Sequence, residues 1–187
     1  MPDEPSLSAP PLPEPLLSQP SAATDATALL IADLTRLHLT LAVAESLTGG
    51  ALAAELIRIP GASVVVNGAV VAYQTELKHS LLGVDRALLA EHGPVHPDVA
   101  RQMAAGARTR LAVGGRDADI GVATTGVASP DAQSGHAPGT VFLGLSRGSE
   151  SWAVELRLDG DRAGIRAGTV ARAVEAVRQL LARETVE

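Results

Sequence analysis

Ser46 has the residue type and the position of a nucleophile. It follows the apolar run 41–43 and comes just before Gly49 and Gly50, where a helical pattern begins. A strand that turns directly into a helix in this way surrounds the turn with free backbone N–H groups and the positive end of the helix dipole. The glycines would let a ligand approach the backbone closely. A serine before a helix also serves as an ordinary N-cap, so both interpretations stay open here.

Lys78 is the only lysine of the chain, against 14 arginines. An amine can lose its proton, whereas a guanidinium in practice cannot. A single lysine can be an ordinary surface residue, but together with Ser46 it suggests a Ser–Lys pair, in which neutral lysine takes the hydroxyl proton. Its pKa, about 10.4 when unperturbed, must then fall through burial or nearby positive charge. Tyr73, the only tyrosine, lies five residues earlier.

Two further groups of polar residues are candidates for the same site. Thr48 and the N–H groups of Gly49 and Gly50 could hold a developing oxyanion. Thr124, Thr125 and Gly126 end a predicted strand, and ligands of open α/β sheets lie beyond the carboxyl ends of strands. Threonine and glycine also close strands in ordinary turns, and that alternative stays open.

Arg162 and Arg166 open the last predicted helix and share one of its faces, because they are four residues apart. They could clamp a phosphate, although arginines on a helix also simply face water. The histidines show no metal-ligand spacing, so we assign no metal; those considered are His79, His92, His96 and His136.

Helical and strand patterns alternate along the chain, and one pair of strands forms a hairpin pattern around Arg147-Gly148. A bulge or turn is expected at Asn67-Gly68, and a loop at 126–138. This order predicts an α/β fold, a three-layer α/β/α single domain with a mixed sheet. The predicted helices are 24–37, 51–59, 75–82, 85–91, 98–113 and 162–184, and the predicted strands are 39–44, 64–73, 119–124, 141–145 and 152–158.

Composition separates a tail, 1–22, from a domain, 23–187. The tail holds seven of the 12 prolines and is expected to be disordered. The chain is 46% apolar with no cysteine, which excludes disulfides and thiolate chemistry. It has no basic stripe, no apolar run near the roughly 20 residues of a membrane span, and no secretory signal. We therefore expect a cytoplasmic protein that binds neither nucleic acid nor a membrane.

Five ordered motifs resemble the CinA C-terminal domain family, whose characterised members are nicotinamide-nucleotide amidases. The resemblance covers about 24–181 and implies an α/β/α domain, often dimeric, that acts in pyridine nucleotide recycling. It implies hydrolysis of the carboxamide of nicotinamide mononucleotide, without a cofactor, to nicotinate mononucleotide and ammonia. The motifs are Ala44-Glu45-Ser46-Leu47-Thr48-Gly49-Gly50, Tyr73-x4-Lys78, Thr125-Gly126-Val127-Ala128-x-Pro130, Pro138-Gly139-Thr140-Val141 and Gly160-Asp161-Arg162.

The resemblance implies Ser46 as nucleophile and Lys78 as its base, with Tyr73 and Thr125 nearby. We expect catalysis by Ser46, Lys78, Tyr73 and Thr48, and binding of the small nucleotide substrate by Glu45, Gly49, Gly50, Thr125, Gly126, Arg162 and Arg166.

The sequence departs from the family pattern at two positions of the predicted loop. Ser129 stands where family members usually carry glycine, and Ala137 where many carry lysine, which bears on substrate preference. The larger companion domain of full-length CinA proteins does not precede this one, so we expect a stand-alone form. The alternative function, from another class, is a catalytically silent nucleotide-binding or regulatory module.

Overall fold

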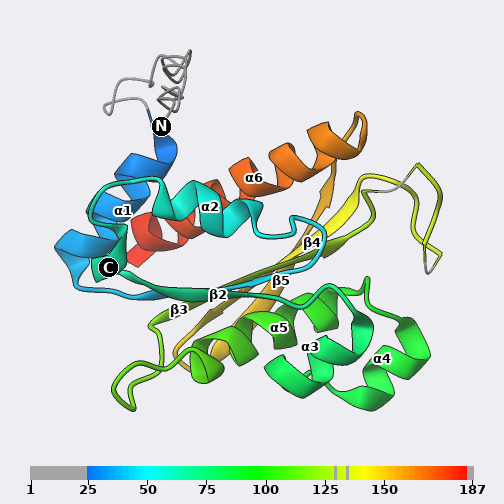
Figure 1. Cartoon of the computed structure of the whole chain (residues 1–187), viewed down its shortest axis with the longest axis horizontal. Coiled ribbons are helices and arrows are strands. Elements are labelled where there is room, and N and C mark those ends of the chain that lie inside the picture. The colour runs from blue at the N-terminus through cyan, green and yellow to red at the C-terminus, as the bar shows by residue number, and fades with distance from the viewer. Residues whose placement is uncertain (1–24, 129, 134, 185–187) are drawn as a thin grey trace, which may run out of the picture.

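A computed structural model of the chain describes residues 25–128, 130–133 and 135–184, and the predicted tail lies outside them. Its centre is a five-stranded sheet in the order β2-β1-β3-β4-β5 (Figure 1). The first three strands of that order are parallel, β4 pairs antiparallel with β3, and β5 pairs antiparallel with β4, which confirms the predicted mixed sheet. The strands are β1 Leu41–Glu45, β2 Val66–Val71, β3 Ile120–Gly126, β4 Thr140–Arg147 and β5 Glu150–Arg157.

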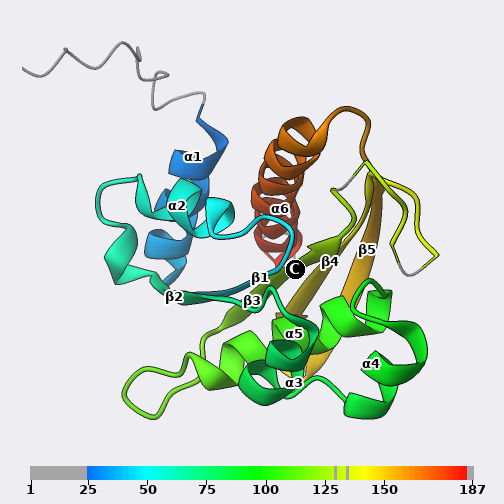
Figure 2. The ribbon, with the colours of Figure 1, turned by 45° about the vertical axis from the view of Figure 1, so that its right-hand side comes forward.

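Helices cover both faces of the sheet, so the α/β class and its three layers are confirmed (Figures 1 and 2). One face is covered by α1 Ala26–Leu37, α2 Ala51–Ile57 and α6 Arg162–Glu184. The other is covered by α3 Thr75–Leu82, α4 Arg86–His92 and α5 Pro97–Arg110. In the part of the chain that the structure describes, none of these helices is both long and apolar enough to cross a membrane.

Alternation along β1 divides the core between the two faces. Val43 packs in the cluster under α1, α2 and α6, whereas Ala42 and Ala44 pack in the cluster against α3, α4 and α5. Residues of a strand point alternately to opposite faces of the sheet. The site at the end of β1 is therefore anchored in both cores.

Helix α5 approaches its neighbours so closely that only glycine fits at three contacts. A Cβ atom on Gly121 of β3 would lie 2.1 Å from the carbonyl oxygen of Ala104, and one on Gly144 of β4 would lie 1.9 Å from that of Ala100. On α5 itself, a Cβ on Gly106 would lie 2.0 Å from the carbonyl oxygen of Leu82, the last residue of α3. Main-chain contacts therefore fix α5 against the sheet and α3 against α5.

Most predicted elements are present, with shifted ends. The expected bulge falls at Asn67, because Leu41 pairs with Val66 and Ala42 with Gly68. The strand predicted from residue 64 begins at Val66, since Ala62–Val64 forms a 3-10 turn. The helix predicted to residue 113 ends at Arg110, because the chain then turns through Gly114 and Gly115, both with positive φ.

Candidate active site

The turn after β1 is held from behind by Glu45. This carboxylate is fully buried. One oxygen accepts hydrogen bonds from the N–H groups of Gly50 (2.9 Å) and Leu52 (3.1 Å), and the other from that of Ala53 (2.8 Å). The structure thus places Glu45 at the N-terminus of α2, where a negative charge satisfies free N–H groups. It is not among the residues that line the pocket described below, and its contacts are with the backbone of the turn.

Ser46 is not the N-cap of α2, because that position is taken by Gly50, with φ 95°. Gly49 also has a positive φ, 61°, so both glycines adopt a conformation that other residues rarely do. This geometry bends the chain sharply between strand and helix. It leaves the Ser46 hydroxyl free of the capping role that the sequence had left open.

The N–H groups predicted as oxyanion donors are already used. The N–H of Gly49 donates to the carbonyl of Ser46 over 3.1 Å, and that of Gly50 donates to Glu45. Within the described ranges, the N–H groups of Leu47 and Thr48 donate no hydrogen bond. Of the two residues only Leu47 lines the pocket described below, so its N–H is the backbone donor of this turn that remains available to an anion.

Thr48 lies behind the turn and pairs with Thr124, the first residue of the predicted strand end 124–126. Its Oγ1 is 2.8 Å from Oγ1 of Thr124 on β3, and both residues are fully buried. The N–H of Ser46 also donates to Oγ1 of Thr124, over 3.4 Å. Thr48 and Thr124 together connect the turn to β3. The parallel pairing of Glu45 with Thr124 brings them together, and such a register cannot be read from the sequence.

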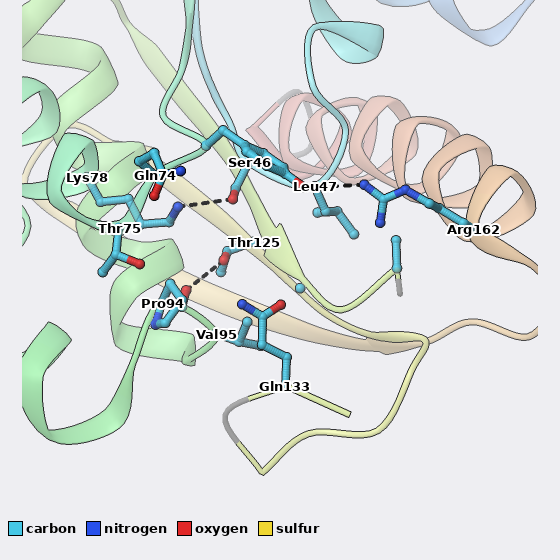
Figure 3. Close-up of a pocket in the computed structure, with 13 residues that line it drawn as sticks. Ser46, Leu47, Gln74, Thr75, Lys78, Pro94, Val95, Thr125, Gln133 and Arg162 are labelled. Atoms are coloured by element: carbon cyan, nitrogen blue, oxygen red, sulfur yellow. Dashed lines mark hydrogen bonds between the residues drawn. The ribbon is translucent and has the colours of Figure 1, made fainter. Parts of the chain in front are cut away.

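Lys78 extends from α3 to Ser46 and is fully buried (Figure 3). Its Nζ donates to Oγ of Ser46 over 3.0 Å and to the carbonyl oxygen of Ala72 over 2.6 Å. Burial lowers the pKa of the Lys78 amine from 10.5 to about 8, because a buried environment disfavours the charged form. Among the described residues no carboxylate forms an ion pair with this amine. A neutral amine next to the hydroxyl is therefore accessible near neutral pH.

Ser46 and Lys78 open into a pocket of about 370 Å³ at the carboxyl ends of β1 and β3 (Figure 3). The structure brings six of the predicted site residues to its wall, and the other five, Glu45, Thr48, Gly49, Gly50 and Arg166, do not line it. The six are Ser46, Tyr73, Lys78, Thr125, Gly126 and Arg162.

The two predicted phosphate ligands have separate positions. Arg162 lines the pocket, and its Nη2 donates to the Tyr73 hydroxyl over 3.3 Å; Tyr73 itself is 58% exposed. Arg166 points to the turn instead, where it donates to the carbonyl oxygens of Leu47 (3.1 Å) and Thr48 (2.7 Å). Their spacing on one helix face was correct, but only Arg162 is placed to meet a ligand in the pocket.

The pocket also has polar side chains that sequence reasoning missed. Gln74 and Thr75 line it from the segment between Tyr73 and Lys78. Their position between two predicted site residues could have identified them from the sequence. Gln133 lines it from the predicted loop, where no pattern distinguished it from its neighbours. No three His, Asp or Glu side chains of the described residues gather as metal ligands would.

The chain is similar to several known proteins in sequence and in structure. Residues 23–181 match the model of the CinA C-terminal domain. A CinA-like protein of Frankia casuarinae is 48% identical over 143 residues, which are 76% of this chain and 32% of the relative, so the chain spans about a third of the length of such curated relatives. A crystal structure of the competence/damage inducible protein CihA from Agrobacterium tumefaciens is 35% identical, with a TM-score of 0.78, over 88% of this chain and 99% of that one. A CinA superfamily protein from Klebsiella pneumoniae is 28% identical, with a TM-score of 0.78, over 88% and 99%.

Proposed function

Because the chain belongs to the CinA C-terminal domain family, we propose that it is an amidohydrolase that converts nicotinamide mononucleotide to nicotinate mononucleotide and ammonia. One observation carries the proposal: the buried Nζ of Lys78 lies 3.0 Å from Oγ of Ser46. A hydroxyl and a neutral amine at this distance form a nucleophile and its general base. The substrate itself comes from the family resemblance.

The first half of the reaction forms an acyl-enzyme. Neutral Lys78 keeps one N–H on the carbonyl of Ala72 and turns its lone pair to the Ser46 hydroxyl. Oγ attacks the carboxamide carbon while its proton moves to Nζ. The negative charge that develops on the carboxamide oxygen lies near the N–H group of Leu47. Lys78 then gives its proton to the departing nitrogen, the C–N bond breaks, and ammonia leaves.

The second half returns the enzyme to its starting state. Lys78, neutral again, accepts a proton from a water molecule that attacks the ester carbon of acyl-Ser46. The ester bond breaks, Oγ of Ser46 takes the proton back from Nζ, and the carboxylic acid product leaves as its carboxylate. One water is consumed and one ammonia formed. No step requires a metal or a redox partner.

Arg162 is our candidate for the nucleotide phosphate. It is a cation at the pocket wall, and its exposed neighbour Tyr73 adds a hydroxyl on the same side. Arginine binds phosphate through paired N–H donors. Arg166 is assigned to the turn, because it donates to the carbonyl oxygens of Leu47 and Thr48 and so holds that segment against α6.

Release of ammonia from nicotinamide mononucleotide tests the proposal. The purified protein is expected to produce ammonia and nicotinate mononucleotide in equal amounts, and Ser46→Ala is expected to produce neither. Binding of the nucleotide without ammonia release would instead favour the silent binding module. Equal turnover by the wild type and Ser46→Ala would remove Ser46 from the mechanism.

A further inference from the structure

Thr125 presents only hydrogen-bond acceptors to the pocket. Its side chain is almost fully buried, and its Oγ1 donates to the carbonyl oxygen of Pro94 over 2.7 Å. A carbonyl oxygen can only accept, so the single hydroxyl proton of Thr125 lies on this bond. The lone pairs of Oγ1 are what remains for a ligand. A group that donates a hydrogen bond is therefore favoured beside Thr125, and a group that only accepts is not.

Strand register places Thr125 beside the nucleophile. Glu45 of β1 pairs with Thr124 of β3 in the parallel ladder. Ser46 and Thr125 directly follow this last pair of the ladder, whose strands lie about 4.8 Å apart. Both line the same pocket, as does Lys78, and Figure 3 shows the three side chains directed toward one region. A carbonyl carbon attacked by Ser46 has its leaving group within reach of both Lys78 and Thr125.

We propose that Thr125 determines specificity for the leaving group by accepting a hydrogen bond from the NH2 of a primary carboxamide. This inference rests on the proposed amidase function and deepens it. A primary amide nitrogen carries two donors, and they persist as ammonia forms. The alkoxy oxygen of an ester carries no donor, so its lone pairs would face the lone pairs of Thr125 and no hydrogen bond would form. Sites built to pair with one polar group reject analogues that lack it.

Thr125 has a competing structural role that the experiment must separate. Its bond to Pro94 also holds the segment between α4 and α5, from which Pro94 and Val95 line the pocket. Loss of that bond would disturb any substrate, whatever its leaving group. The ratio of kcat/KM for two substrates that differ only in the leaving group therefore reports the role of Thr125 as a hydrogen-bond acceptor.

The test compares nicotinamide mononucleotide with the corresponding methyl ester, the mononucleotide of methyl nicotinate. Thr125→Val keeps the shape but removes the hydroxyl. It is expected to lower kcat/KM for the amide relative to the ester roughly tenfold, the effect of one lost hydrogen bond. Thr125→Ser keeps the hydroxyl and is expected to retain the wild-type ratio of the two substrates. Thr169→Val is the matched control: Thr169 is also buried and donates to a backbone carbonyl, that of Ile165, but does not line the pocket.

Each outcome decides the inference. A fall in the amide-to-ester ratio for Thr125→Val, with the ratio kept in Thr125→Ser and Thr169→Val, supports it. An equal fall for both substrates, or no fall, would overturn it and leave Thr125 as a support for Pro94. A wild type that cleaves the ester but releases no ammonia from the amide would overturn the proposed function, and the amide specificity with it.

Discussion

Lys78 contacts Ser46 across 3.0 Å as a buried amine with a pKa lowered to about 8 by loss of solvent. Because only the neutral amine can take the serine proton, kcat/KM is expected to rise with pH and to level off above about 8. A pH profile of initial rates at low substrate concentration measures this. A plateau that already begins near pH 6, with no rise toward 8, would contradict Lys78 as the base.

Charge at position 78 is not sufficient for catalysis. Lys78→Arg keeps a cation that does not lose its proton near neutral pH, so kcat is expected to fall roughly 10²- to 10⁴-fold, as for loss of a general base. The kcat of Ser46→Ala is expected to fall about as far, and that of the double variant only a little further, because the two residues act as a unit. Steady-state kinetics on the three variants tests this. Substantial activity in Lys78→Arg would end the Ser–Lys mechanism.

Burial of Lys78 is expected to cost stability. Its pKa of about 8 in the folded state lies below the 10.5 of the unfolded chain. The cost of burying the charge is therefore full below pH 8 and fades as pH rises from 8 to 10.5. Lys78→Met is expected to be inactive, and its stability relative to the wild type is expected to be higher at pH 7 than at pH 10 by about 2–3 kcal/mol, because the loss of the bonds to Ser46 and Ala72 is the same at both pH values. Urea unfolding at both pH values measures the difference, with Ser46→Ala as an inactive control that keeps the lysine.

Glu45 is expected to act through the turn. A glutamine can accept with one oxygen only, so in Glu45→Gln a donor would face an N–H of Gly50 or Ala53. We expect a loss of about 1–3 kcal/mol in stability and a lower kcat, because the turn that carries Ser46 loosens. Asp85→Ala is the control, since Asp85 caps α4 through Oδ1, which accepts from the N–H groups of Ala87 and Leu88, and does not line the pocket. It should lower the Tm and leave kcat intact; if both variants behave alike, Glu45 has no special link to the nucleophile.

Arg162 and Arg166 are expected to have different kinetic effects. Arg162→Ala should raise KM for the nucleotide roughly ten- to a hundredfold, the range for a hydrogen bond to a charged group, and nicotinamide riboside should be a poor substrate of the wild type. Arg166→Ala should mainly lower kcat, because it releases the carbonyls of Leu47 and Thr48. Equal rises in KM for both variants, or equal turnover of riboside and mononucleotide, would contradict this division.

The sequence predicted the layers and the mixed sheet well, because apolar periodicity and turn residues mark helices and strands directly. It also singled out Ser46 and Lys78, since a single lysine among arginines is a local signal of composition. It did not predict which way polar groups of the turn would point. Glu45, in the same motif as Ser46, bonds to α2, and the N–H groups of Gly49 and Gly50 bond within the turn. The contact between Thr48 and Thr124 depends on the register of β1 and β3, which has no local signature in the sequence.

The main-chain contacts of α5 determine which positions of this protein tolerate substitution and which do not. Gly121 and Gly144 seat α5 on the sheet, and Gly106 seats α3, which carries Lys78, on α5. A larger side chain at any of the three would displace the base by way of the backbone, with no flexible side chain to absorb the movement. Laboratory evolution of a new substrate range should therefore hold these three codons fixed and randomise the opposite wall at Gln133 and Arg162.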